Sequence, residues 1–337
     1  MDYKTKYDKF ALCREMLQTP EIIRNFSLLG CRDLVSSIKE IGSLFLTGEG
    51  SSRIFPAKNA VYHSMVQGSP LRISTEGARQ ASEYDLSKSI VFGASNSGST
   101  KEVICLMNQL KAKGHTHCFG LTARENTKLS EISDDTFVLT CGWEEAVAAT
   151  KSVAEQALFY QELLSQVEGS SISGLLSELA DSVQDALETE IPEQITDSIA
   201  SAGTVYFAGR NDGVAEELTL KTNEITRKKS DYLEGTYAVH GIEEVMNKGD
   251  VVILMNPFKS ELEKIKETLA DGVGLNVIAV SDEQTIFPTI RVSPVQGAEG
   301  YTYLAAGWNI LVEVGMKLDI NLDKAERARK VGNELVC

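Results

Sequence analysis

The sequence contains no segment that predicts a membrane anchor or a secretory leader. No apolar run approaches the roughly 20 residues that a helix needs to cross a bilayer. The first ten residues, MDYKTKYDKF, lack the apolar core and the small-residue cleavage site of a secretory signal. We therefore expect a cytoplasmic protein.

Cysteine is sparse, and its pattern predicts neither a disulfide framework nor a metal centre. No CxxC pair is present, and no cysteine has a histidine nearby at a ligand spacing. The six cysteines are Cys13, Cys31, Cys105, Cys118, Cys141 and Cys337. Because a chain of this length does not need disulfides to fold, we expect free thiols and no metal site.

Positive charge is also in short supply. The 33 Lys and Arg residues are outnumbered by 48 Asp and Glu residues, which gives a net charge of −15. A field of that sign repels nucleic acid and anionic membranes, so we expect neither as a partner. It also repels a phosphorylated metabolite, so any phosphate site has to act through short-range hydrogen bonds.

Short apolar runs alternate with helical stretches along most of the chain. The runs of the first half are SLFLTG (43–48), LRIST (71–75), SIVFGA (89–94), HCFGLT (117–122) and TFVLT (136–140). Those of the second half are TVYFAG (204–209), SDYLEG (230–235), VVILMN (251–256), NVIAVS (276–281) and TIRVS (289–293). Strands joined through helices predict parallel sheets with helices on both faces.

The order and spacing of these runs predict two α/β domains related by an internal duplication of about 130 residues. We place the first domain, with an N-terminal helical segment, at residues 1–168 and the second at 169–337. Thr19-Pro20 is predicted to begin a helix, as N-cap and first helical residue. Further helices are expected at about 100–113, 144–166, 174–200 and 299–318.

The segment from Ser95 to Thr100 predicts a phosphate site. A buried strand runs into Ser-Asn-Ser-Gly-Ser-Thr, and a helix follows at once. A helix N-terminus offers free backbone N–H groups and the positive end of its dipole, and the hydroxyls add uncharged donors. Plain helix capping explains one hydroxyl but not four in six residues.

A second loop, Gly48 to Ser52, follows the first strand. Its G-x-G resembles the start of a dinucleotide fingerprint, but Arg53 stands where the third glycine would be. A sugar-phosphate loop accounts for it better, since the sequence also lacks the Gly-Lys-Ser/Thr signature of a nucleotide P-loop.

Together these motifs resemble the sugar-isomerase (SIS) domain family of phosphosugar enzymes, above all the isomerase half of glucosamine-6-phosphate synthase. The resemblance covers the chain from about residue 40 to its end and includes the Glu-x-x-Val-Ala-x-Thr-Lys segment at 144–151. It implies two tandem SIS domains, each with a flavodoxin-like parallel five-stranded sheet. The phosphate-binding residues that it implies are Ser51, Ser52, Ser95, Asn96, Ser97 and Thr100. Further substrate contacts are implied at Gly50, Ala148 and Thr150.

The resemblance also implies the acid–base residues, in the second domain. Glu224 and His240 are 16 residues apart, as in the family. By this resemblance Glu224 corresponds to the base and His240 to the group that opens the sugar ring. Lys221 matches a family lysine one turn before Glu224, and Lys330 resembles the lysine that contacts the open-chain sugar. The family shares this site across a homodimer, so we expect a homodimer here.

The chain departs from the family at three places. Ile242 replaces the proline after His-Gly, Tyr237 replaces an acidic residue, and Asn96 replaces a glutamine. No glutaminase domain or N-terminal cysteine nucleophile is found, so the ammonia-incorporating reaction of the synthase is not expected. In the second domain MNPFKS (255–260) lacks the hydroxyl cluster of Ser95–Thr100. One domain is therefore expected to hold phosphate while the other supplies the acid–base pair.

These residues predict an aldose–ketose isomerase for a hexose or hexosamine phosphate, without metal or organic cofactor. A carboxylate base moves a proton between adjacent carbons through an enediol, and a second group opens the ring. The same pair supports an amino-sugar-phosphate deaminase or a fructosamine-6-phosphate deglycase. A non-catalytic sugar-phosphate sensor is the alternative from another class, since it would need only the phosphate loop.

Overall fold

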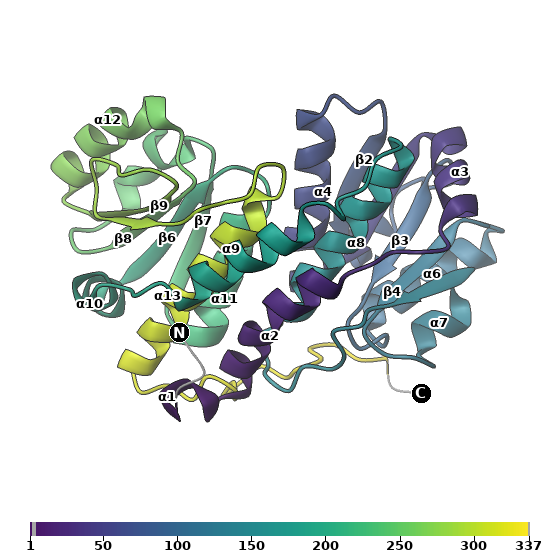
Figure 1. Ribbon diagram of the computed structural model, residues 1–337, viewed down its shortest axis with the longest axis horizontal. Helices are drawn as coiled ribbons and strands as arrows, with labels where there is room; N and C mark the ends of the chain where they lie inside the picture. Colours follow the sequence, from purple (N-terminus) through teal and green to yellow (C-terminus); the bar gives the residue numbers. More distant parts are fainter. Residues whose placement is uncertain (2–4, 336–337) are drawn as a thin grey trace. The chain divides into compact units, whose positions relative to one another are not determined.

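The structure is a computed structural model that describes residue 1 and residues 5–335 (Figure 1). Cys337 lies outside the described residues. Two compact units are present, and each is named here by its sheet. The first-sheet unit comprises residues 21–145, 149–176 and 327–337, and the second-sheet unit comprises residues 1–20, 146–148 and 177–326. The units therefore interleave along the chain, whereas the sequence-based boundary at 168/169 assigned each domain one continuous segment.

The first sheet is parallel throughout, with the strand order β2-β1-β3-β4-β5. Its strands are β1 (Ser43–Gly48), β2 (Arg72–Gly77), β3 (Ile90–Ala94), β4 (Cys118–Thr122) and β5 (Asp135–Val138). This is the flavodoxin-like order predicted for the family, and it makes β1 and β3 central strands. All five residues of β3 are buried, as expected for a strand covered on both faces.

Alternation along the central strands separates two apolar cores, one on each face of the first sheet. Leu44 and Phe92 belong to one core, while Phe45 and Val91 belong to the other. The first core is completed by side chains from α3, α4 and α8, and the second by side chains from α5, α6 and α7. The helices are α3 (Arg32–Ile41), α4 (Ile54–Val66), α5 (Ala78–Ala81), α6 (Lys101–Ala112), α7 (Lys128–Ile132) and α8 (Lys151–Val167). Helices on both faces are thus confirmed.

The second sheet is also parallel, with the order β10-β9-β8-β6-β7. Its strands are β6 (Thr204–Gly209), β7 (Lys229–Glu234), β8 (Val251–Met255), β9 (Asn276–Ser281) and β10 (Thr289–Arg291). Counted from the first strand of each sheet, the two sheets have the same strand order. The helices of this unit are α1 (Thr5–Asp8), α9 (Leu176–Glu188), α10 (Glu193–Ser201), α11 (Val214–Thr226), α12 (Leu262–Ile265) and α13 (Glu299–Lys317), with a π-helical turn at Lys266–Val273.

Close helix packing fixes α11, the helix that carries Lys221 and the predicted base Glu224. A Cβ at Gly307 of α13 would lie 2.3 Å from the Leu218 side chain of α11, so only glycine leaves room for that leucine. Glycine in a helix interior costs about 0.5–1 kcal/mol relative to alanine, and this contact offsets that cost. The α11 helix therefore packs directly against the backbone of α13 at Gly307.

Three helix predictions are corrected by the structure. Thr19-Pro20 begins no helix, because α2 (Ala11–Asn25) continues through Pro20. The helix expected from 144 begins only at Lys151, and Thr150, the residue before it, donates its N–H to the Glu144 carboxylate. The stretch 174–200 is two helices, α9 and α10, and Pro192 stands at the N-cap of the second. Among the described residues, no helix is long and apolar enough to cross a membrane.

Candidate functional site

The loop predicted to bind phosphate, called the phosphate loop below, lies at the carboxyl edge of the first sheet, where ligands bind in open parallel sheets. It is the 95–100 segment, and it joins β3 to α6. The loop after β1 forms a 3-10 turn at Gly50–Ser52 and lies at the same edge, because β1 and β3 are parallel neighbours. A Cβ at Gly48 would lie 2.9 Å from the Ser52 carbonyl oxygen and 3.0 Å from that of Ala94, so glycine lets the two loops approach.

The hydroxyl groups of the phosphate loop are hydrogen-bonded to one another. The Ser95 and Thr100 hydroxyl oxygens are 2.8 Å apart, and those of Ser97 and Ser99 are 2.9 Å apart. Ser95 also accepts from the Thr100 N–H at 3.3 Å. These four hydroxyls form a compact group of uncharged donors beside the first turn of α6, as a phosphate site requires in an acidic protein.

Gly98 gives this loop its turn. Its φ of +66° lies in the left-handed region, and a Cβ there would lie 2.3 Å from the Thr127 side chain. Gly98 also bonds through both backbone groups, donating to the Ser95 carbonyl oxygen and accepting from the Leu129 N–H. Its substitution would therefore displace the loop from both neighbours.

The C-terminal residues pair with the phosphate loop. The Lys101 N–H donates to the Asn333 carbonyl oxygen at 3.0 Å, and the Leu335 N–H donates to the Ser99 carbonyl oxygen at 3.1 Å. These two bonds flank an antiparallel bridge between Thr100 and Glu334. The segment 333–335 thus extends the ordered edge of the loop and uses one of the first N–H groups of α6.

Glu144 organises the side of this loop on which Asn96 lies. Its carboxylate is fully buried and accepts from the Thr150 N–H at 2.7 Å, the Thr150 hydroxyl at 3.2 Å and the Ser152 hydroxyl. It also accepts from the Asn96 amide nitrogen at 3.3 Å and lies 3.9 Å from the Lys330 ammonium. Glu144 therefore connects the phosphate loop to two further predicted site residues, Thr150 and Lys330.

The other end of the Asn96 amide is open to a ligand. Its oxygen is buried, and it accepts no hydrogen bond from the described residues. Because Glu144 holds the amide nitrogen, this oxygen presents a fixed acceptor to a donor group such as a sugar hydroxyl.

Two cations lie near Trp143, the residue before Glu144. The Arg124 guanidinium carbon is 4.9 Å from the centre of the indole ring, and the Lys330 ammonium is 5.7 Å from it. Trp143 is 40% exposed, which is unusual for a side chain of its size. Arg124 and Trp143 could not be predicted from the sequence, because they are 19 residues apart in irregular loops and form no motif.

In the second-sheet unit, α11 brings three charged side chains together. Lys221 is fully buried, with its ammonium 2.8 Å from a Glu224 carboxylate oxygen and 3.3 Å from a Glu217 oxygen. Burial alone would lower the pKa of Lys221, but Glu224 and Glu217 raise it above its usual value of 10.5. The Glu224 side chain is 23% exposed, whereas that of Glu217 is not exposed at all. Glu217 was missed, although its place four residues before Lys221 on a helix could have indicated it.

His240 follows a 3-10 turn at Tyr237–Val239 and is exposed. Within the described residues no hydrogen bond joins it to Lys221 or Glu224. Of the other predicted residues, Ala148 lies in the second-sheet unit, whereas Gly50, Ser51, Ser52 and Lys330 lie in the first-sheet unit with the phosphate loop.

The loop after β8 in the second sheet differs in chemistry from the phosphate loop. The Arg210 guanidinium donates to the Asn256 carbonyl oxygen and lies 4.5 Å from the Phe258 ring centre. Lys259 is ion-paired with Glu283 at 2.9 Å. The cationic side chains around this loop therefore already interact with other protein groups, and the loop also lacks a hydroxyl cluster.

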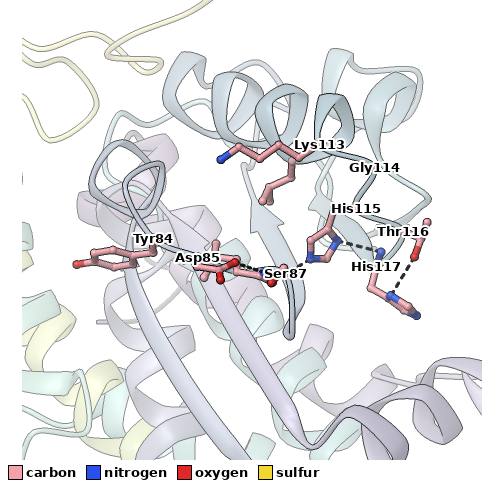
Figure 2. A pocket seen from close by; sticks show the side chains of 10 residues that line it. Tyr84, Asp85, Ser87, Lys113, Gly114, His115, Thr116 and His117 are labelled. Atoms are coloured by element: carbon pink, nitrogen blue, oxygen red, sulfur yellow. Dashed lines mark hydrogen bonds between the residues drawn. The ribbon is translucent and has the colours of Figure 1, made fainter.

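A pocket of about 180 Å³ opens at the other edge of the first sheet (Figure 2). His115 and His117 line it just before β4 begins, and the His115 ring is held at both nitrogens. Its Nδ1 accepts from the His117 N–H at 3.2 Å, and its Nε2 lies 3.0 Å from the Leu86 carbonyl oxygen. These contacts give His115 a structural role, away from the carboxyl edge.

Comparison with known proteins finds relatives by sequence and by fold. No protein-family model matches the chain. The chain is 25% identical over 308 residues to glutamine–fructose-6-phosphate aminotransferase (isomerizing) of Aeropyrum pernix, covering 84% of this chain and 49% of that protein. The enzyme of the same name from Caulobacter vibrioides is 24% identical over 213 residues, covering 59% of this chain and 35% of that protein. The chain thus spans half or less of the length of these curated relatives.

Solved structures share the whole fold. The C-terminal domain of glucosamine-fructose-6-phosphate aminotransferase from Francisella tularensis has a TM-score of 0.77 at 17% identity, covering 96% of this chain and all of that one. Tagatose-6-phosphate ketose/aldose isomerase from Escherichia coli gives 0.75 at 17% identity, covering 94% and 95%. Glucosamine-6-phosphate deaminase from Thermotoga maritima gives 0.72 at 20% identity, covering 95% and 99%. Two flavodoxin-like sheets, the serine-rich loop after β3 and these relatives together support an SIS phosphosugar isomerase family for the chain.

Proposed function

We propose that the protein is an aldose–ketose isomerase that acts on a hexose or hexosamine phosphate through an enediol or enediolamine, with Glu224 as the base. The observation that carries the proposal is the Glu217–Lys221–Glu224 cluster of α11. Its buried ammonium holds the Glu224 carboxylate in one orientation, while the Glu224 side chain stays partly exposed. A base held in this way needs little reorganisation before it abstracts a proton from a sugar carbon.

The phosphate loop supplies the binding energy in this proposal. The hydroxyls of Ser95, Ser97 and Thr100 and the N-terminus of α6 grip the phosphate without a cation. Fixing one end of an open-chain sugar limits where its reacting carbons can lie, and that entropy is no longer lost in the chemical step. Ser51 and Ser52, at the same sheet edge, are assigned to the same group.

His240 opens the sugar ring and protonates its oxygen in this scheme. Its exposed position after the Tyr237–Val239 turn suits a residue that meets substrate from outside its own sheet. We assign it to a site shared between two subunits of a homodimer, with Lys330 as a contact of the open-chain sugar. A cytoplasmic setting accompanies the proposal, in line with the free thiols of the described cysteines.

The test follows proton exchange at the substrate in deuterated water. Fructose-6-phosphate, tagatose-6-phosphate and glucosamine-6-phosphate are incubated with the protein, and solvent deuterium at C1 or C2 and the product are followed by NMR. We expect exchange with at least one of them. Glu224→Gln should abolish that exchange, while Glu263→Gln, an exposed glutamate of α12, should leave it unchanged.

Three outcomes would contradict the proposal. Exchange that survives in Glu224→Gln removes Glu224 from the role of base. Binding of a phosphosugar without any exchange favours a sugar-phosphate sensor, and release of ammonia from glucosamine-6-phosphate favours a deaminase.

A further inference from the structure

We propose that the second-sheet unit contains a binding pocket for a small, uncharged planar lactam or amide, held by the free edge of β9. The pocket has a volume of about 400 Å³. It is lined by residues of α10, of the π-helical turn Lys266–Val273, of β9 and of the segment before β10. It lies on the β10 side of the sheet, whereas α11 joins β6 to β7 on the other side. The pocket is therefore separate from the proposed base, and it does not depend on the proposed function.

The pocket forms where β10 is shorter than its neighbour β9. β10 pairs only with residues Ala279–Ser281, so the first half of β9 has no strand on that side. The chain enters β10 through Phe287 and Pro288, which line the pocket together with Val277. In the observed register the next donor to β9 would be the N–H of residue 288, and proline has none. The ladder therefore stops beside the pocket.

Val277 has a backbone donor and a backbone acceptor that this short strand leaves unpaired. Successive residues of a strand direct their N–H and C=O groups to alternate sides. The Asn276 N–H donates to the Asp250 carbonyl oxygen on the β8 side at 3.0 Å, and the Ala279 N–H donates to the Pro288 carbonyl oxygen on the β10 side at 2.9 Å. Val277 thus faces the β10 side, where the described residues give its N–H and carbonyl oxygen no hydrogen bond.

The two free groups of Val277 define the chemistry of the ligand. Val277 is only 5% exposed, and buried backbone groups are nearly always hydrogen-bonded. A lactam or a primary amide carries its C=O and an N–H side by side, so it can accept from the Val277 N–H and donate to the Val277 carbonyl oxygen. A phosphate or a carboxylate offers acceptors alone and would leave the carbonyl oxygen unpaired.

The length of the free edge favours a small molecule over a peptide. A peptide that adds a strand to a sheet gains its affinity from a row of main-chain hydrogen bonds. Here Ala279 is already paired with the β10 segment, and Asn276 faces β8, so only Val277 is available. One residue is too short an edge for such a strand.

The side chains of the pocket suit the faces of a flat, uncharged ring. Ile278 and Phe287 are buried apolar residues of the lining, and Ile286 is 47% exposed beside them. A ring that enters the pocket can cover the exposed part of Ile286. Lys266, the charged residue of the lining, is already ion-paired with Asp271 at 2.6 Å. The pocket therefore favours an uncharged ligand over an anion.

Ser198 provides a third polar contact. It lines the pocket from α10, and its hydroxyl oxygen is buried without a hydrogen-bond partner in the described part of the chain. A serine inside a helix commonly donates to the carbonyl oxygen four residues before it, and Ser198 does not. A second carbonyl group or a ring nitrogen of the ligand can accept from this hydroxyl.

Binding can be measured by NMR at the isoleucine methyl groups of Ile195, Ile278 and Ile286, which line the pocket. The probes are uracil, 2-pyridone and nicotinamide. Each is compared with its fully N-methylated analogue, which keeps the carbonyl group and lacks the amide N–H. Toluene is the apolar control.

We expect at least one probe to bind with a Kd below about 1 mM, and its N-methylated analogue to bind about tenfold or more weakly, because the Val277 carbonyl oxygen stays unpaired. Ile286→Ser should weaken binding about threefold to tenfold, whereas Val245→Ser, which changes another exposed aliphatic residue outside the pocket, should not. Ala270→Leu should fill the pocket and abolish binding, while Ala112→Leu, at an exposed position of α6, should leave it unchanged.

The opposite results would overturn the inference. If no probe shifts the three methyl signals at about 5 mM, the pocket does not recognise an amide. If an N-methylated analogue or toluene binds as tightly as the parent probes, the pocket is an apolar cavity without backbone recognition. If Ile286→Ser leaves the affinity unchanged, the ligand lies elsewhere. This last variant alters an exposed side chain, so it gives an answer even where Ala270→Leu fails to fold.

Discussion

Replacing Lys221 tests the charge cluster on which the proposed chemistry depends. Lys221→Met keeps a long apolar side chain but leaves the fully buried Glu217 without its ammonium partner 3.3 Å away. Removing one member of a buried ion pair typically costs 3–5 kcal/mol, because the remaining charge stays desolvated. We therefore expect the free energy of unfolding of the second-sheet unit to fall by about 3–5 kcal/mol. At roughly 2–4 °C per kcal/mol for a unit of this size, its Tm should fall by about 6–20 °C.

The assay has to report on one unit, because two-domain proteins need not unfold in a single step. In a Trp143→Phe background, the remaining tryptophan is Trp308 of α13, whose emission follows the second-sheet unit in urea. The raised pKa of Lys221 means that its ion pairs contribute fully below about pH 10 and are lost only as the pH rises through that raised pKa. The cost should therefore be the same at pH 6 and pH 8.

The double variant Glu217→Leu/Lys221→Met separates charge from packing. Replacing both partners by apolar residues is often neutral or stabilising, so most of the lost stability should return. Catalysis should stay lost in both variants, since Glu224 no longer has the ammonium that orients it. A single variant that costs less than about 1 kcal/mol, or a double variant no more stable than the single, would refute this account of the cluster.

Three further predictions concern individual positions. Gly98→Ala should weaken phosphosugar binding by at least about tenfold, because the φ of residue 98 is positive and the added Cβ would overlap the Thr127 side chain. The control Gly114→Ala also has a positive φ but open space around the Cβ, so it should lower stability alone. Calorimetric titration measures the binding of both variants, and thermal melting measures their stability. Burial raises the pKa of Asp212 to about 6 despite the hydrogen bond it accepts from a backbone N–H, so the folded state disfavours its charged form and stability falls as pH rises from about 4 to 6. Asp212→Asn should therefore stabilise the protein at pH 7 by up to about 3 kcal/mol and by little at pH 4, as measured by urea unfolding at both values. Glu144→Gln, which removes the charge facing Lys330, should lower kcat/KM for the substrate about tenfold or more while a thermal melt still shows a folded first-sheet unit.

The sheets could be predicted from the sequence, because each buried parallel strand is a short apolar run between turn residues. All ten predicted runs coincide with observed strands, most of them within one or two residues at each end. The strand–loop–helix arrangement around residues 95–100 could be predicted for a local reason, since strand, serine-rich turn and helix follow one another directly. The family resemblance supplied the strand order and singled out Glu224 and Lys221, whereas their ion pair was seen only in the structure.

Other features depend on contacts that have no sequence period. Pro20 is compatible with a helix interior here, although proline usually marks a first turn. The Glu144 carboxylate accepts from the backbone N–H and the hydroxyl of Thr150, the residue before α8, and no local sequence pattern predicts these contacts. Arg124 meets Trp143 only because two loops lie at the same edge of one sheet.

The Gly307–Leu218 contact means that Gly307, which lies outside the proposed site, helps to set the position of Glu224, the proposed base. Because α13 is buried along most of its length, a side chain at 307 has no solvent to turn towards, and α11 has to move instead. A shift of that helix by even part of an ångström would carry Glu224 away from a sugar carbon without unfolding the sheet. Screens for inactive but well-expressed variants should therefore recover substitutions in α13 as readily as substitutions in the site.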